Sequence, residues 1–203
     1  ACELQKTVYN ARKEILGENH PHTLTTLANL ACSYSNLGDY GKALEMRNIV
    51  YNERKEVLGV NHPDTLTTLA NLANSYSDLG DYNKALEIEI KVYNARKEIL
   101  GKNHPDTLRS LADLASSYSD LGDYKKALEL EIKVYTAFKE ILGETHPSTL
   151  IILDNLANSY FRLGDYKKAL ELQNTVYTTR IEIFGANHPD TLTTLSKLAN
   201  FSF

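Results

Sequence analysis

The sequence has no block of basic residues and no long apolar run. Its 203 residues include 22 Lys and Arg against 26 Asp and Glu, for a formal net charge of −4. Because the basic residues are not clustered, the electrostatic footprint of a nucleic-acid-binding protein is missing. The uncharged apolar runs are a few residues long, far below the ~20 residues that cross a bilayer. We therefore expect neither nucleic acid nor a membrane as a partner.

Cysteine is also scarce, and no secretory signal sequence is visible. The two cysteines, Cys2 and Cys32, lack the spacing of a metal or redox site. This usage favours a reducing, cytoplasmic setting in which no disulfide forms. No phosphate-binding glycine-rich loop or nucleophile motif is present, so we expect no cofactor.

The sequence instead consists of one 42-residue unit repeated almost five times. Residues 59–100 and 101–142 differ at only nine of 42 positions. Gly-Asp-Tyr recurs with the same period at 38–40, 80–82, 122–124 and 164–166. His-Pro recurs at 20–21, 62–63, 104–105, 146–147 and 188–189. A period of this length is the signature of a repeat protein.

Each repeat has the pattern of two helices, as residues 59–100 illustrate. Pro63 and Asp64 suit the first turn of a helix over about 63–79, which Gly80 ends in the left-handed conformation. Asp81 is the N-cap of a second helix over about 82–100, and we expect Gly101 to end it as Gly80 ends the first. Apolar residues recur at steps of three and four, at Leu66, Leu69, Leu72, Ala73 and Tyr76 and then at Ala85, Leu86, Ile88, Val92, Ala95 and Ile99.

Such a helix pair cannot bury its apolar faces alone, so neighbouring pairs must stack. We predict an all-α solenoid of antiparallel helix pairs that forms a single array over residues 1–203. The complete repeats are 17–58, 59–100, 101–142 and 143–184. The flanking partial repeats are 1–16, a second helix only, and 185–203, a first helix only.

Neither end carries the polar capping helix that normally closes a solenoid. Two explanations are open. The sequence is a piece of a longer protein, or its bare ends stack on neighbouring molecules. Head-to-tail contacts of the second kind are heterologous and favour filaments or open superhelices.

The run from Leu69 to Tyr76, followed by Leu79-Gly80-Asp81-Tyr82 and Ala85, resembles the tetratricopeptide repeat. The 42-residue length and the Lys97-Glu98-Ile99-Leu100-Gly101 ending resemble its kinesin-light-chain type. The resemblance implies a right-handed superhelix whose first helices line a concave, peptide-binding groove. It also admits a sensor tail of a larger signalling protein. One second-helix position, which bears on the outer packing of that helix, departs from the family, which usually has an apolar residue there. It carries Arg47, Glu89, Glu131 and Gln173.

The differences among repeats gather on one face of the first helices. Four of the nine differences above lie on the first helix, at residues 67, 68, 71 and 74. Steps of three and four place 67, 71 and 74 side by side on a helix. The fourth repeat departs most, with Ile151, Ile152, Asp154, Phe161 and Arg162. The predicted groove residues are Asn29, Asn71, Asn74, Arg109, Asp113, Ile151, Asn155, Asn158, Phe161, Arg162 and Lys197.

These residues predict a groove for an extended peptide. Asparagine has both a donor and an acceptor, so a row of asparagines can satisfy a peptide backbone. Exposed Ile151 and Phe161 would form an apolar pocket, and Arg109 and Arg162 would attract acidic side chains. The alternatives are a solvated face on which asparagine is a neutral filler, and an array that acts as a spacer or assembles with itself. A carboxylate clamp is disfavoured because Arg109, Arg162 and Lys197 lie on three different repeats.

The histidines and tyrosines read as structural because they recur with the repeat. Successive His-Pro histidines are about 10 Å apart, the spacing of packed helices, and cannot share a zinc ion. His20 and His22 are close, but two ligands make no structural site, so no metal is expected. The three tyrosine registers, led by Tyr76, Tyr82 and Tyr93, are assigned to the core. An enzyme needs a unique constellation, and nearly every residue here occurs four or five times, so no catalytic activity is expected.

Overall fold

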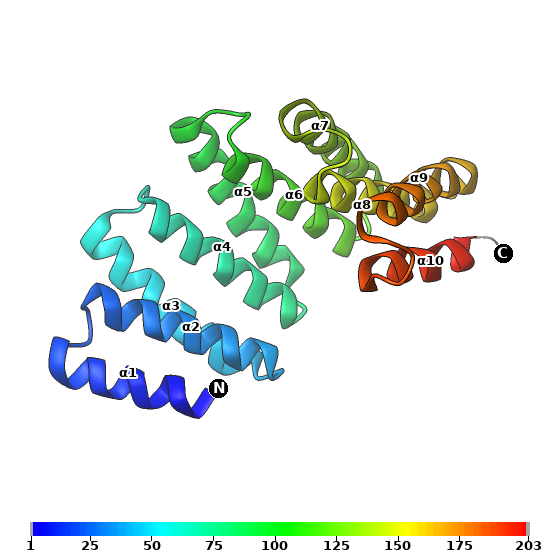
Figure 1. Cartoon of the computed structure of the whole chain (residues 1–203). Helices are drawn as coiled ribbons and strands as arrows, with labels where there is room; N and C mark the ends of the chain where they lie inside the picture. Colours follow the sequence, from blue (N-terminus) through cyan, green and yellow to red (C-terminus); the bar gives the residue numbers. More distant parts are fainter. Residues whose placement is uncertain (1, 202–203) are drawn as a thin grey trace. The chain divides into compact units, whose positions relative to one another are not determined.

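The computed structural model describes residues 2–201, which form ten helices and no strand (Figure 1). The predicted helices over about 63–79 and 82–100 are confirmed as α4 and α5. Ala1, Ser202 and Phe203, which end the two predicted partial repeats, lie outside the described residues. The helices are α1 (Cys2–Leu16), α2 (Pro21–Asn36), α3 (Tyr40–Leu58), α4 (Pro63–Asp78), α5 (Tyr82–Leu100), α6 (Pro105–Asp120), α7 (Tyr124–Leu142), α8 (Pro147–Arg162), α9 (Tyr166–Phe184) and α10 (Pro189–Phe201).

The chain divides into two compact halves, an N-terminal half of Ala1–Gly101 and a C-terminal half of Lys102–Phe203. In the N-terminal half, α1 to α5 pack in succession, each against its neighbours in sequence. In the C-terminal half, α6 to α10 do the same. The predicted all-α fold of antiparallel helix pairs is therefore confirmed within each half. We call α2, α4, α6, α8 and α10 the first helices and the others the second helices.

The histidine of each His-Pro pair caps a first helix. Pro63 occupies the first turn of α4, and the Nδ1 atom of His62 accepts a hydrogen bond of 3.2 Å from the backbone N–H of Asp64. This bond satisfies one of the amide groups that a helix N-terminus leaves without a partner. The same cap recurs at His20, His104, His146 and His188. The periodic histidines thus have a structural role, and residues 2–201 contain no cluster of three potential metal ligands.

The turn from first to second helix is a Schellman motif followed by an N-cap. The N–H of Asp81 donates to the carbonyl of Tyr76 and the N–H of Gly80 donates to that of Ser77. Gly80 has φ of 81°, as the predicted left-handed conformation requires. The Oδ1 atom of Asp81 then accepts from the N–H of Lys84, which starts α5. Both sequence predictions for this turn are confirmed.

The end of each second helix is different. Gly101 has φ of 89° and ψ of 161°, which is not the left-handed helical conformation. The prediction that Gly101 ends α5 in the manner of Gly80 is therefore wrong. Its N–H still closes the helix on the carbonyl of Lys97, but the chain then leaves in an extended direction open almost only to glycine.

The core of each half consists of apolar residues at the predicted helical spacing. In the N-terminal half, one buried cluster joins α4 to α5 through Leu69, Leu72, Ala73, Ile88 and Val92. In the C-terminal half, the equivalent cluster joins α8 to α9 through Leu153, Leu156 and Val176.

The predicted core position of the tyrosines is correct for only part of the set. Tyr76 is half-buried and packs against the α4–α5 cluster. Tyr82 and Tyr166, however, are 37% and 59% exposed. Each is the first residue of a second helix, so its side chain projects at the turn rather than between helices.

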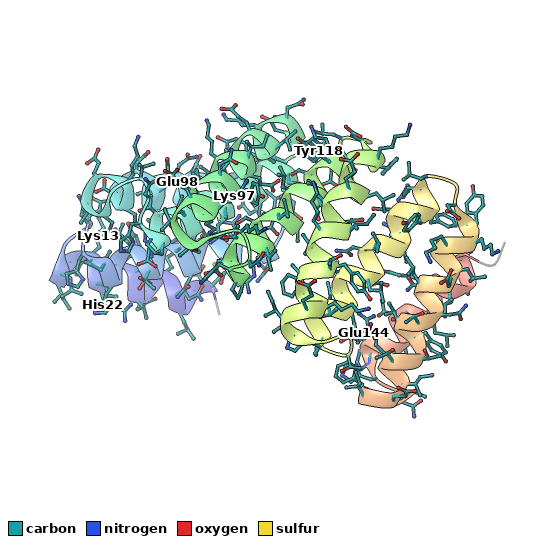
Figure 2. The ribbon with its side chains drawn as sticks, turned by 90° about the horizontal axis from the view of Figure 1, so that it is seen from above. Lys13, His22, Lys97, Glu98, Tyr118 and Glu144 are labelled. Atoms are coloured by element: carbon teal, nitrogen blue, oxygen red, sulfur yellow. The ribbon has the colours of Figure 1, made fainter. Side chains whose placement is uncertain are left out.

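Some charged contacts at the surface recur at equivalent positions of two repeats. Lys13 pairs with Glu18 beyond the end of α1, and Lys139 pairs with Glu144 at the equivalent place beyond α7. Figure 2 labels one member of each pair, Lys13 and Glu144. The ammonium groups of Lys84 and Lys126 each lie 4.4 Å from the ring centre of a tyrosine, Tyr76 and Tyr118 respectively. These groups are exposed, and exposed pairs contribute about 1 kcal/mol or less each.

Candidate peptide-binding face

The predicted groove residues occupy the sides of the first helices, and we call this set the first-helix face. Seven of its members are exposed: Asn29, Asn74, Arg109, Ile151, Asn155, Asn158 and Arg162. The other four are half-buried: Asn71, Asp113, Phe161 and Lys197. No member is fully buried, so each presents atoms to solvent.

Four amides of the first-helix face have no hydrogen-bond partner among residues 2–201. They belong to Asn29 and Asn74 in the N-terminal half and to Asn155 and Asn158 in the C-terminal half. Asn71 differs because its side chain is half-buried and therefore less accessible, and its backbone carbonyl accepts a bond from Arg47. The four exposed amides therefore keep their donors and acceptors available to a ligand.

Two of the three cations on this face are already paired. Arg109 lies 3.2 Å from the carboxylate of Asp106, one turn earlier in α6. Lys197 of α10 lies 2.5 Å from Oδ2 of the buried Asp154 in α8. Asp154 also accepts a 2.7 Å bond from the amide of Gln173 in α9. Asp154, one of the departures of the fourth repeat, thus joins three helices.

Ile151 and Phe161 do not form the predicted apolar pocket. They lie ten residues apart in α8, which separates them by roughly 15 Å along the helix axis. The Phe161 ring instead packs edge-on against Tyr166, with ring centres 5.2 Å apart. Ile151 is 52% exposed at the opposite end of the helix. The prediction of a shared pocket was wrong because the two residues, although they belong to the same repeat, are separated by most of the length of α8.

Ile152, another departure of the fourth repeat, is buried and belongs to a bridge between repeats. Elsewhere an arginine of a second helix donates to a threonine of the next first helix, at 2.8 Å from Arg54 to Thr68. Arg12 with Thr26 and Arg180 with Thr194 repeat this contact. At the same register between the third and fourth repeats, the pair is Phe138 and Ile152, so both positions are apolar.

The second-helix position that departs from the family is buried, not on the outside. Arg47 and Glu131 are each 7% exposed, and Gln173 is fully buried. At Arg47 and Glu131 this side chain contacts a serine of the next first helix. Arg47 donates to Oγ of Ser75 at 2.5 Å and to the carbonyl of Asn71 at 2.9 Å. Glu131 is hydrogen-bonded to Ser159.

A polar cavity of about 200 Å³ opens beside Glu131 in the C-terminal half. Burial raises the pKa of the Glu131 carboxyl to about 7, although the hydrogen bond from Ser159 opposes this shift. The Oε2 atom of Glu131 has no hydrogen-bond partner. Two of the exposed amides, those of Asn155 and Asn158, line the cavity. The other lining residues are Ser116, Ser119, Asp120, Glu131 and Ser159.

Comparison with known proteins identifies the family. Profiles described as tetratricopeptide repeat match residues 65–106 and residues 1–48, 90–140, 132–181 and 148–200. The chain belongs to the tetratricopeptide repeat family. The resemblance stated from Leu69 to Ala85 is thereby confirmed. A comparison with curated proteins gives no match to this chain.

Solved structures place this tetratricopeptide repeat chain with kinesin-light-chain-like arrays. A Podosopora anserina putative kinesin light chain with nearly identical repeats is 28% identical, over 90% of this chain and 86% of that one, with a TM-score of 0.77. BtubC (BKLC) from P. vanneervenii is 18% identical over 99% and 83%, with a TM-score of 0.81. A Rap protein complexed with Competence and Sporulation Factor is 14% identical over 98% and 58%, with a TM-score of 0.73. The last two share the fold alone.

Sequence reasoning missed the lining of the Glu131 cavity, apart from Asn155 and Asn158. The signal was present in the second-helix position itself, which carries Arg, Glu, Glu and Gln where an apolar residue is usual in this tetratricopeptide family. Polar residues of opposite charge at one packing position indicate an internal polar contact.

Among the helices described for residues 2–201, none is long and apolar enough to cross a membrane.

Proposed function

We propose that this chain is a non-catalytic, cytoplasmic interaction scaffold that binds an extended peptide segment along the first-helix face. The observation that carries the proposal is a set of exposed amides without partners on the first helices of each half, at Asn29 and Asn74 and at Asn155 and Asn158. Most buried polar side chains of the framework are bonded to other parts of the protein, as Arg47 and Gln173 show. The amides of the face stand apart from this framework.

The chemistry of an amide suits a peptide backbone. Each asparagine offers two N–H donors and one acceptor oxygen, which match the carbonyl and N–H of an extended chain. One such bond contributes about 0.5–1.5 kcal/mol net. Several bonds are therefore needed for useful affinity, and the four amides, which occupy two neighbouring registers of the first, second and fourth complete repeats, can supply them. A Rap protein of the same fold is complexed with Competence and Sporulation Factor, which agrees with ligand binding by such arrays.

Selection from a random peptide library tests the proposal. The wild-type chain is expected to select extended peptides that bind it reversibly. Replacing Asn29, Asn74, Asn155 and Asn158 by alanine should weaken the selected peptides by roughly 100-fold or more, at about 1 kcal/mol for each lost bond. Fluorescence anisotropy of the labelled peptides measures the change.

A matched control is available on the second helices. Asn52, Asn83, Asn94 and Asn174 are also exposed asparagines, and their alanine variants should bind the selected peptides as the wild type does. Circular dichroism melting of both quadruple variants establishes that each is folded. Equal binding by the first-helix variant and the wild type would refute the first-helix face as the binding surface.

A second candidate function is self-association, which exposed apolar side chains favour. Leu4 and Ile15 of α1 are 73% and 80% exposed, and Leu192 and Leu195 of α10 are 50% and 44% exposed. Light scattering after size exclusion, at several concentrations, tests this candidate. A mass that rises above one protomer with concentration supports it, and a mass fixed at one protomer excludes it.

A further inference from the structure

The Glu131 cavity is unlike the same place in the N-terminal half. Shifting each lining residue by two repeats places the equivalent site between α2 and α4, with Arg47 in the position of Glu131. There the guanidinium of Arg47 contacts the carbonyl of Asn71, Oγ of Ser75 and, at 4.0 Å, Sγ of Cys32. The N-terminal site therefore contains a guanidinium from the protein itself.

The corresponding groups in the C-terminal half surround an open space. Asn155, Ser159 and Ser116 occupy the positions of Asn71, Ser75 and Cys32, and all three line the cavity. The second helix supplies a carboxylate in place of the guanidinium. The acceptors that hold Arg47 in one half have equivalents in the other, where the protein supplies no cation to meet them.

The charge of the cavity points the same way. Its lining contains two carboxyl groups, Asp120 and Glu131, and no basic residue. Glu131 is 7% exposed and its Oε2 atom has no hydrogen-bond partner. A buried carboxylate without a compensating charge is costly, and an opposite charge within reach relieves that cost.

The opening of the cavity lies on the first-helix face. Asn155 and Asn158 of α8 are exposed, as are Ser116 and Asp120 at the end of α6, whereas Ser159 and Glu131 are buried. A side chain that enters from solvent therefore passes the exposed amides before it reaches the carboxylate. A ligand on the first-helix face is placed to send one side chain inward.

We propose that this cavity binds the guanidinium group of an arginine side chain of the bound peptide, with the Glu131 carboxylate as its counter-charge. That the arginine comes from a bound peptide rests on the proposed function. The affinity of the cavity for a guanidinium group does not. Guanidinium suits the site better than ammonium because its planar N–H groups reach a carboxylate and neighbouring oxygens at once.

Methylguanidinium tests the site without any peptide. Titration into the uniformly ¹⁵N-labelled chain at pH 8 should shift backbone amides of α6, α7 and α8 around the cavity, and the shifts should saturate. N-methylurea, a neutral molecule of similar shape, should leave them unchanged. At pH 5 binding should weaken about 10-fold or more, because protonation removes the charge of Glu131, whose pKa is about 7. Asp120 is the other titratable group of the lining, so the Asp120→Asn variant is titrated in parallel.

Glu131→Gln is the decisive variant, and glutamine occupies the same position naturally as Gln173. It should abolish the saturable shifts, while Glu129→Gln on the exposed side of α7 should retain them. The proposal is overturned if methylguanidinium produces no saturable shift, or if the shifts survive Glu131→Gln.

The peptide selection separates this proposal from the proposed function. Peptides selected by the wild type should carry an arginine at a fixed position, and its replacement by alanine should weaken binding about 10- to 100-fold. Glu131→Gln should remove that preference. Methylguanidinium binding without any selected peptide contradicts the peptide-binding function but not the cavity. Selected peptides with no basic position, together with no methylguanidinium shift, contradict the cavity but not the function.

Discussion

The Arg47 site of the N-terminal half and the Glu131 site of the C-terminal half share one framework and differ in charge. In both, a second-helix side chain reaches a serine of the next first helix. A hydroxyl can donate or accept, so Ser75 accepts from a guanidinium while Ser159 donates to a carboxyl. The framework therefore tolerates opposite charges at one position. The N-terminal site is occupied by the guanidinium of Arg47, whereas the C-terminal site has the carboxyl group of Glu131 beside a cavity.

Removing the arginine should produce the largest effect on stability. Arg47→Ala leaves Ser75 and the carbonyl of Asn71 without their donor and opens a cavity between α2 and α4. We expect the free energy of unfolding to fall by about 2–4 kcal/mol, measured by urea denaturation. Arg109→Ala, at an exposed arginine, is the control and should change it by about 0.5 kcal/mol or less. An equal effect of the two variants would show that the Arg47 site is not structural.

Glu131→Gln should have the opposite sign, and its effect depends on pH. The carboxyl pKa is about 7 in the folded chain and has an ordinary value of 4.5. Between these values the folded state binds more protons than the unfolded state, so its stability falls as pH rises through this range. The variant lacks this loss and should be more stable than the wild type by up to roughly 3 kcal/mol at pH 8, and about equal at pH 4.

Urea denaturation across this pH range measures the difference between the two chains. Glu129→Gln, two residues away on the exposed side of α7, should keep the wild-type profile. A Glu131→Gln chain that is less stable than the wild type at pH 8 would show that the carboxylate is compensated within the protein.

The bridges between repeats extend the comparison with a smaller effect. Arg54 and Thr68 form a polar bridge, and Phe138 and Ile152 occupy the same register. Phe138→Arg or Ile152→Thr alone should destabilise the chain by about 1–3 kcal/mol, because each mixes a polar with an apolar partner. The double variant should recover about 1 kcal/mol or more in a double-mutant cycle. Additive effects would mean that the two positions are independent.

The smallest effect is expected at the amides of the first-helix face. Replacing Asn29, Asn74, Asn155 and Asn158 by alanine should change the melting temperature by a few degrees at most, because exposed side chains without partners contribute about 0.5 kcal/mol or less each. Differential scanning calorimetry checks this result. A large loss of stability would assign these residues to the framework rather than to a ligand.

The sequence predicted the helices well because each repeat contains residues that mark the beginning and end of its helices. The ends of the helices are set by local motifs: proline after histidine, Gly-Asp-Tyr, and a glycine after the second helix. The period then confirmed each boundary several times. The conformation of Gly101 and the exposure of Tyr82 were missed because both depend on where the chain goes beyond a turn, which residue type alone does not determine.

The candidate site was harder to predict because it depends on contacts between repeats. The faces of single helices led to Asn155 and Asn158, but the Glu131 cavity needs α6, α7 and α8 in place together. Ion pairs between helices also make some charged residues of the first-helix face less available to a ligand. Lys197 was assigned to the face by its register, yet Asp154 of another helix neutralises it at 2.5 Å. Ile151 and Phe161 were assigned to one pocket because both are large apolar departures of the fourth repeat, but ten residues of α8 separate them.

Mapping of a selected peptide on the ¹⁵N-labelled chain tests most directly whether the first-helix face is the binding surface. The predicted result is a set of saturable amide shifts on α2, α4, α6 and α8, around the exposed asparagines, that disappears in the quadruple first-helix variant. Saturable shifts confined to the second helices, or shifts that persist in that variant, would contradict a binding site on the first-helix face.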